Sequence, residues 1–248
     1  MMTQLLRPPT LGRVVIDKIR ETILRGELLP GAPLREVQLS NSLGVSRGTI
    51  RESVRQLREE GLVEIFPHRG AFVTHLSHKK AKEICTLRAL LEPYAVRLAV
   101  EKGAYEPQVL DRLEALLSRW GELEREGNIH EILNTEIEFH RGICQGSGHQ
   151  LLLEVLENLV SQSQLLALHT KVYGTDLVSD DASHRAILDA IRSGDPTVAE
   201  EAVRRHILDA GELLIGRLEQ LETVDAQFSG ADISPSDLQV CESQVSNA

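Results

Sequence analysis

The segment from Ser46 to Leu57, with the sequence SRGTIRESVRQL, restricts the possible structures of this chain more than any other. Its apolar side chains recur at the spacing of one helical face, namely Ile50, Val54 and Leu57. The other side carries an arginine ridge made of Arg47, Arg51, Arg55 and Arg58. Ser46 is a favourable N-cap and Gly61 a favourable helix stop. The segment therefore predicts a bounded helix that docks on a core through one face and presents arginines on the other.

A shorter helix is expected directly before it, over residues 36–43. This helix ends at Gly44, which leaves a three-residue turn before the arginine-bearing helix. Two helices joined in this way form a helix-turn-helix, whose second helix enters the major groove of DNA. The spacing therefore predicts double-stranded DNA as a partner.

The overall net charge of -10 at first argues against a DNA-binding protein, but the charge is unevenly distributed. Residues 1–77 hold 11 Lys+Arg and 8 Asp+Glu, whereas residues 78–248 hold 16 and 29. Ordinary variation between domains could produce such a difference. It is informative here because the arginines concentrate on one predicted helix, and a basic head on an acidic body suits a head that touches phosphate.

Length and composition limit the class of protein. A chain of 248 residues has room for two domains. No apolar run is long enough for a membrane span, and residues 1–11 are too polar for a signal peptide. Three widely spaced cysteines argue against a disulfide framework and for a reducing, cytoplasmic location.

The first 77 residues are expected to form a winged helix-turn-helix. A helix over 13–26 would turn Ile16, Ile19 and Ile23 inward, before the two helices described above. After Gly61, the alternating segments 62–66 and 71–74 predict two strands joined by the turn 67–70. Three helices followed by a β-hairpin make this fold.

Several short motifs make this part of the chain resemble the GntR family of bacterial transcription regulators. They are Leu28-Leu29-Pro30-Gly31, Leu43-Gly44-Val45-Ser46-Arg47, Glu60-Gly61-Leu62-Val63 and Arg69-Gly70-Ala71-Phe72-Val73, with Leu39, Arg51-Glu52 and Leu57 in register. The match covers nearly all of residues 11–76, in order and almost without gaps. In that family the start of the third helix and the tip of the wing contact the operator.

Carried over by position, the resemblance implies DNA contacts by Ser46, Arg47, Gly48, Thr49 and Arg51 on the helix, and by His68, Arg69 and Gly70 in the wing. Arginine can donate two hydrogen bonds to guanine, and a hydroxyl can hold a phosphate or a base edge. Gly48 departs from the threonine-like residue of many relatives, and Val37 from an arginine of some. His68 has an equally good explanation as a turn residue, and Arg55 and Arg58 are interpreted as a solvated face.

From His78 onward the pattern becomes helical throughout, which predicts an all-α bundle. Helices are expected at about 79–103, 106–126, 129–146, 149–170, 182–193 and 196–222, with Pro93 interrupting the first. The polar composition beyond about Asp225 predicts a disordered tail. The expected division is a DNA-binding domain at 1–77, a helical domain at 78–224 and a tail at 225–248.

Three of the nine histidines lie on separate predicted helices of the bundle, at His140, His184 and His206. Glu136 precedes His140 by four residues and therefore projects from the same helical face. These four side chains could converge on a divalent transition metal. From spacing alone, however, histidines on helices are more often exposed or singly hydrogen-bonded than metal ligands.

A second resemblance favours the metal. Arg88 with Glu92, Phe139-His140, His184-Arg185-Ala186-Ile187, Gly194-Asp195 and Arg205-His206 are similar to the FCD ligand-binding domain of one large GntR subfamily, over about residues 80–220. Where that motif is complete, an Asp or Asn four residues before the first histidine joins three histidines around a metal. The resemblance implies His140, His184 and His206 as ligands of zinc, with nickel or manganese as alternatives. Glu136 stands at the acidic position and is a departure.

An open coordination position beside three imidazoles would favour a small carboxylate as effector. Arg88 could supply a second, charge-assisted contact to that ligand. An ion pair with Glu92, four residues on, explains Arg88 equally well without any ligand.

These features together predict a metabolite-responsive repressor that binds a palindromic operator as a homodimer. One alternative is an enzyme that uses the metal to activate water against a small acid, although no general base apart from Glu136 is evident. Another is an effector-free DNA-binding protein with inert histidines.

Overall fold

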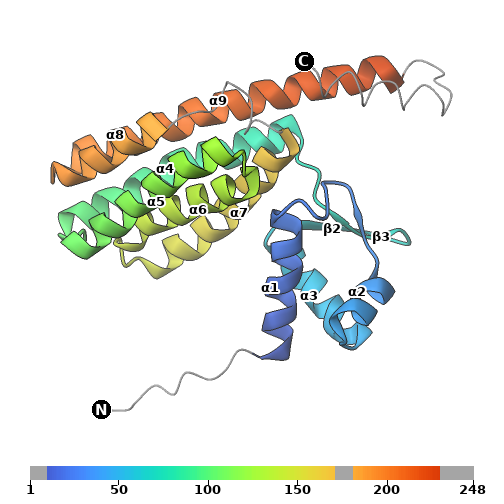
Figure 1. Ribbon diagram of the computed structural model, residues 1–248. Helices are drawn as coiled ribbons and strands as arrows, with labels where there is room; N and C mark the ends of the chain where they lie inside the picture. Colours follow the sequence, from blue (N-terminus) through green and yellow to red (C-terminus); the bar gives the residue numbers. More distant parts are fainter. Residues whose placement is uncertain (1–9, 171–180, 230–248) are drawn as a thin grey trace, which may run out of the picture.

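The computed structural model describes residues 10–170 and 181–229, arranged as a small head below a larger helical body (Figure 1). The head contains α1 (Leu11–Leu24), β1 (Pro33–Leu34), α2 (Glu36–Leu43), α3 (Arg47–Glu59), β2 (Val63–Phe66) and β3 (Gly70–Val73). The body contains α4 (His78–Glu101), α5 (Pro107–Glu126), α6 (Ile129–Gln145), α7 (Gln150–Thr170), α8 (Asp181–Arg192) and α9 (Pro196–Ser229). The mainly helical class with a winged head is therefore confirmed.

The head is built around contacts between α1 and α3. Ile19 and Ile23 of α1 are buried as expected, but Val15 takes the innermost position at the start of the helix and Ile16 is half-buried. From α3, the core receives the apolar stripe of Ile50, Val54 and Leu57. The predicted division of α3 into an apolar and an arginine face is thus confirmed.

The wing is a three-stranded antiparallel sheet in the order β1-β3-β2. β2 and β3 form the predicted hairpin, with Val63 opposite Val73 and Phe66 opposite Gly70. β1 was not predicted, because a strand of two residues is too short to show a periodic pattern and one of the two is Pro33.

Both predicted boundaries of α3 are confirmed. The Ser46 side chain accepts a hydrogen bond from the Thr49 amide at 3.1 Å, which is the expected N-cap. At the other end Gly61 has φ +77°, and the Leu62 amide donates back to the Leu57 carbonyl. This is the Schellman arrangement that glycine permits.

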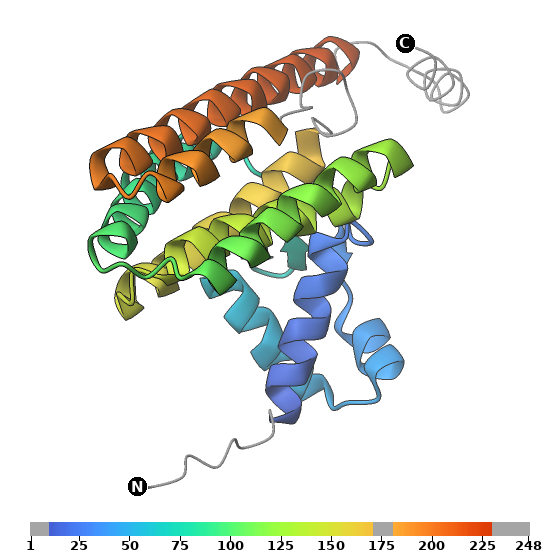
Figure 2. The ribbon, with the colours of Figure 1, turned by 60° about the vertical axis from the view of Figure 1, so that its left-hand side comes forward.

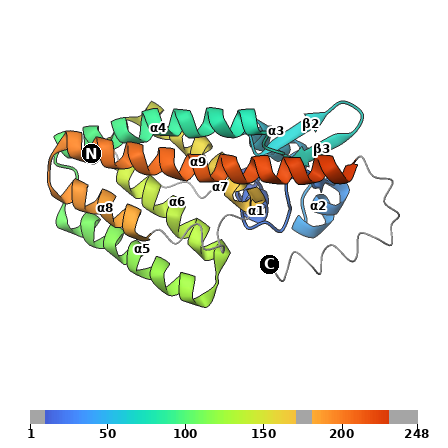
Figure 3. The ribbon, with the colours of Figure 1, turned by 90° about the horizontal axis from the view of Figure 1, so that it is seen from above.

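In the body, α4 and α9 run alongside each other over much of their length (Figure 3). The expected interruption at Pro93 is wrong, because α4 continues through it. Proline removes the hydrogen bond that the Ala89 carbonyl would otherwise accept within the helix. That carbonyl instead accepts a hydrogen bond from Arg204 Nη1 of α9 at 3.0 Å. Tertiary packing therefore replaces the lost helical bond.

α9 extends to Ser229 and so includes residues 225–229 of the segment expected to be disordered. Residues 230–248 of that expected tail lie outside the described residues. Within the described ranges, no helix combines the length and apolar character needed to cross a membrane.

The head and body share one apolar core, at the place where α1 meets α7 (Figure 2). The cluster includes Ile23 and Leu62 from the head together with Leu165, Leu166 and Leu218 from α7 and α9. A second cluster, formed within the body, surrounds Phe139 and Ile187. Because the first cluster crosses the domain boundary, the position of the head depends on packing against α7.

Candidate functional site

The exposed face of α3 carries two arginines that share one acidic partner. Arg47 and Arg51 are 58% and 57% exposed, and both reach Glu36 of α2. Their nitrogens lie 3.5 Å and 2.9 Å from the same Glu36 oxygen. Exposed pairs of this kind contribute little to stability. Glu36 instead holds the two guanidinium groups side by side on the outer face of the helix-turn-helix.

The first turn of α3 contains the other predicted DNA contacts on this helix. The Ser46 and Thr49 hydroxyls lie 2.9 Å apart, so both are already engaged at the N-cap. Gly48 is exposed, and a Cβ added there would meet Ser46 Oγ at an ordinary 3.6 Å. Packing within the protein therefore does not require glycine at this position.

In the wing, the Arg69 guanidinium packs against two phenylalanine rings. Its guanidinium carbon lies 5.6 Å from the ring centroid of Phe66 and 5.8 Å from that of Phe72. The two rings pack edge to face. Cation–π contacts of this kind orient a charged group while leaving it exposed to a partner. Arg69 is thereby fixed at the tip of the hairpin.

The remaining wing positions form the turn itself. His68 has φ +62°, an uncommon value for a residue other than glycine, and Gly70 has φ +97°. This conformation gives His68 a structural role in the turn, and its contact with DNA stays a prediction. Arg55 forms a surface pair with Glu52 at 3.4 Å, in line with the interpretation as a solvated face.

In the body, the three predicted histidines converge from α6, α8 and α9. One ring nitrogen from each of His140, His184 and His206 lies within 4.8 Å of the other two, and all three side chains are buried. The Nε2 atoms of His140 and His206 are 3.3 Å apart. We call this group the histidine cluster.

Neighbouring polar groups orient two of these rings. Glu92 Oε2 lies 2.7 Å from His140 Nδ1, and Ser183 Oγ lies 2.8 Å from His206 Nδ1. Both Nε2 atoms are therefore turned toward the centre of the cluster. Partners on the far nitrogen fix the tautomer and orientation of metal-binding histidines in the same manner.

Aromatic rings enclose His184. The ring centroids of Trp120 and Phe139 lie 4.6 Å and 5.3 Å from that of His184. Trp120 is completely buried and thus forms part of the wall around the cluster.

A buried ionic chain adjoins the histidine cluster. Arg88 Nε donates to Glu92 Oε1 at 2.5 Å, and Arg88 Nη1 donates to Ser163 Oγ of α7 at 2.6 Å. Burial alone would raise the pKa of Glu92, but the charges of Arg88 and His140 lower it to about 2. Glu92 is therefore an anion that links Arg88 to a histidine of the cluster.

The donor set of the cluster suits a transition metal. Burial, followed by the charges of His184, His140 and Arg88, holds the pKa of His206 well below its ordinary value. A neutral imidazole is the form that binds a metal. Three imidazoles, two of them with oriented rings, match the ligand set of catalytic-type zinc sites, which keep one position open.

Glu136, the fourth predicted ligand, is not part of the close group of ring nitrogens. It is half-buried and lines a small cavity of about 10 Å³ together with Arg88, His140 and Ser163. Its role as a metal ligand stays a prediction.

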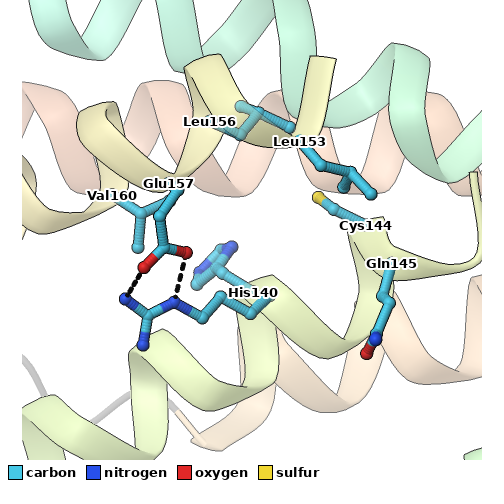
Figure 4. A pocket seen from close by; sticks show the side chains of 8 residues that line it. His140, Cys144, Gln145, Leu153, Leu156, Glu157 and Val160 are labelled. Carbon is cyan, nitrogen blue, oxygen red and sulfur yellow. Dashed lines mark hydrogen bonds and ion pairs between the residues drawn. The ribbon is translucent and has the colours of Figure 1, made fainter. Parts of the chain in front are cut away.

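A larger pocket of about 260 Å³ lies between α6 and α7 and is also lined by His140 (Figure 4). Leu153, Leu156 and Val160 form its apolar part. At its rim Arg141 donates two hydrogen bonds to Glu157, at 2.8 Å and 2.5 Å. This ion pair joins the two helices beside the pocket.

Sequence reasoning did not find all of the residues around the cluster. The sequence predicted Glu92 as a partner of Arg88 but not of His140, and it predicted no role for Ser163 or Ser183. The spacing of four from Arg88 was a usable signal for the first contact. The contacts to His140, His206 and α7 join separate helices, and no local pattern predicts them.

Comparison with known proteins places both parts of the chain. Residues 11–73 match bacterial regulatory proteins of the gntR family, and residues 83–209 match the FCD domain. An "Uncharacterized HTH-type transcriptional regulator in unstable DNA locus" from Streptomyces ambofaciens is 33% identical, across 80% of this chain and 82% of the relative. A "Probable D-xylose utilization operon transcriptional repressor" from Paenarthrobacter nicotinovorans is 32% identical, across 80% and 86%. The solved structure of E. coli McbR/YncC shares the fold, with a TM-score of 0.73 and 24% identity across 87% of this chain and 100% of that one.

Proposed function

Because this chain belongs to the GntR family of bacterial regulatory proteins and carries an FCD domain, we propose that it is a metal-containing repressor controlled by a small carboxylate. Regulators of this family bind DNA operators, so the head supplies the DNA-binding activity. Repression is favoured by the similarity to the xylose-operon repressor. Such a role places the protein beside DNA in the bacterial cytoplasm.

On the DNA side, Arg47 and Arg51 are the proposed readers of the major groove. They are exposed, adjacent and held by one carboxylate, Glu36. A DNA partner would replace that carboxylate with base edges or phosphates. Ser46, Gly48 and Thr49 lie beside them, and Arg69, with His68 and Gly70, would reach DNA from the wing.

A homodimer is the proposed assembly, because two-fold symmetry matches a palindromic operator. Its support is a stripe of exposed apolar side chains along α4, formed by Leu87, Leu90 and Tyr94. Their spacing places them on one helical face. Light scattering on the wild type and on Leu90→Glu tests this assembly, and a monomeric wild type would contradict it.

In the body, His140, His184 and His206 would hold the metal, which we propose to be zinc. A bound divalent ion would supply a Lewis-acidic position for a carboxylate. Glu92 and Ser183 would keep the two histidine rings oriented. Arg88, at the edge of the neighbouring cavity, would add a charge-assisted contact to the same anion.

The observation that carries this proposal is the convergence of three buried imidazoles on one point. Metal analysis of the purified protein tests it directly. We expect about one divalent ion per wild-type chain and none after combined replacement of His140, His184 and His206 by glutamine. An unchanged metal content in the variant would contradict the site.

The effector can be sought by thermal shift with a panel of small carboxylates, with and without chelator. A ligand that binds the folded state raises its melting temperature. The proposed site requires that the chelator abolish this shift. Steady, metal-dependent consumption of the acid would instead indicate an enzyme, and equal operator affinity with and without the acid would indicate an effector-free DNA-binding protein.

A further inference from the structure

Helix α7 contacts both the ionic chain beside the histidine cluster and the end of the DNA-reading helix. Ser163 accepts the hydrogen bond from Arg88 Nη1 at 2.6 Å. Gln162, the preceding residue, donates from Nε2 to the Glu60 backbone carbonyl at 3.0 Å. Two neighbouring positions of one helix thus face the two functional parts of the molecule.

The contact on the head side is unusually close. Gly61 follows the end of α3, and a Cβ at this position would lie only 2.5 Å from Gln162 Nε2. Glycine therefore permits the approach of α7 to the chain here. The Glu60 side chain also accepts two hydrogen bonds from Arg20 of α1, at 2.9 Å and 2.8 Å. The Glu60–Gly61 segment consequently joins α1, α3 and α7.

The contact on the body side belongs to a chain of buried groups. From His140 it passes through Glu92 at 2.7 Å and Arg88 at 2.5 Å to Ser163 at 2.6 Å. Occupancy of the histidine cluster would act on Glu92 through His140, and on Arg88 and Ser163 through Glu92. Buried ionic contacts tolerate little separation, because an unpaired buried charge is costly.

Among the helices that wall the cavity beside Arg88, α7 carries neither a cluster histidine nor Arg88 or Glu92. The cavity of about 10 Å³ has room for roughly one water molecule, so a carboxylate would have to displace a wall. The cluster histidines lie on α6, α8 and α9, while Arg88 and Glu92 lie on α4. α7 contributes none of these residues and can shift without separating the ligands.

The joint between α7 and the head also has open space beside it. One groove of about 570 Å³ is bordered by Arg20 and Glu60 of the head and by Asn158 and Ser161 of α7. Another of about 540 Å³ lies between α1 and the helices α6 and α7. Open grooves therefore border the joint between α7 and the head on both sides.

We propose that α7 transmits occupancy of the histidine cluster to the DNA-reading helix, and that Gln162 is the positioning residue that connects α7 to α3. This inference rests on the proposed metal site and specifies how that site is coupled to the head. Coupling of this kind requires an element with two arrangements that both sites bias. We propose α7 as that element, and the Gln162–Glu60 hydrogen bond is its connection to the head.

Hydrogen–deuterium exchange of the full chain, metal-free and with zinc chloride, tests the coupling. In the wild type we expect zinc to change exchange in peptides from α6 and α9, and also in peptides spanning residues 47–62. In Gln162→Met, which keeps the length of the side chain but removes the donor, the α6 and α9 responses should remain while the head response is lost.

Gln164→Met is the matched control, because Gln164 is also buried on α7 but donates to Asn134 within the body at 3.1 Å. It should retain the head response. Gly61→Ala, with a Cβ directed at Gln162, should reproduce the loss. Gly44→Ala controls for its backbone strain, since Gly44 has φ +65° and no atom within 4 Å of an added Cβ.

The outcomes separate the two proposals. No wild-type response in α6 and α9 would refute the metal site, and the coupling inference with it. A response in the body without one in the head would overturn the coupling alone. So would a head response that persists in Gln162→Met, in a variant whose melting temperature confirms that it is folded.

Discussion

The arginine face of α3 and the histidine cluster are both groups of charged or polar side chains, yet their surroundings are opposite. Arg51 is 57% exposed and its partner Glu36 is partly solvated, whereas the His140 side chain is 1% exposed and its partner Glu92 is fully buried. Exposed pairs contribute little to folding, while an unpaired buried charge is severely destabilising. Substitutions on the arginine face of α3 should therefore affect DNA binding alone, and substitutions around the cluster should affect folding and binding together.

The largest effect is expected from Glu92→Leu. This change leaves the Arg88 guanidinium buried without its anionic partner, which should lower the free energy of unfolding by about 3–5 kcal/mol. Urea denaturation of the metal-free protein measures it. The double variant Arg88→Met/Glu92→Leu removes both charges and should recover most of the loss. A single variant as stable as the wild type would mean that the ionic chain is not energetically coupled.

Glu92 should also make the stability of the folded protein depend on pH in the acid range. Because the pKa of Glu92 is lowered from 4.5 to about 2 in the folded state, the unfolded state binds the proton first as pH falls. The contribution of Glu92 to stability is present above pH 4.5 and is lost as pH falls toward 2. The double variant should show a shallower acid limb than the wild type in pH-dependent denaturation.

Arg51→Ala tests the other side of the comparison. We expect a loss of about 1–3 kcal/mol in binding to an operator selected from random DNA, if Arg51 reads a base edge. The free energy of unfolding should stay within about 0.5 kcal/mol of the wild type, because the lost pair with Glu36 is exposed. Arg55→Ala, which removes an arginine from the solvated face, is the control. Equal loss on operator and random DNA would reassign Arg51 to a phosphate contact.

Ser183→Ala should weaken zinc binding with a smaller effect on folding than Glu92→Leu. Ser183 holds His206 Nδ1, and loss of such an outer partner lowers metal affinity by about tenfold or more. Competition with a chelating dye gives the affinity. Ser193→Ala at the end of α8 is the control, because its hydroxyl donates to the Ala190 carbonyl and not to a histidine. Equal zinc affinity in both variants would remove Ser183 from the site.

The same comparison explains how much the sequence could predict. Local sequence spacing was sufficient to predict the arginine face of α3, its Ser46 N-cap and its end at Gly61. The cluster histidines lie on three helices, so a family resemblance was needed to bring them together. The predicted interruption at Pro93 was wrong for the same reason. The carbonyl that proline leaves free accepts a hydrogen bond from Arg204, which lies on a helix distant in the sequence. Contacts between helices, such as Glu92 with His140, have no periodic signal.

The smallest effect is expected from Arg69 in the wing, whose side chain is exposed but held in place by two aromatic rings. Arg69 is held over Phe66 and Phe72 but remains exposed, so Arg69→Ala should weaken operator binding by about 0.5–1 kcal/mol. Arg69→Lys keeps the charge but fits a planar or stacked contact less well, and should show an intermediate loss. Fluorescence anisotropy at two salt concentrations distinguishes the causes, because a lost phosphate contact lowers the salt dependence. An unchanged affinity for Arg69→Ala would exclude Arg69 from the DNA-binding surface.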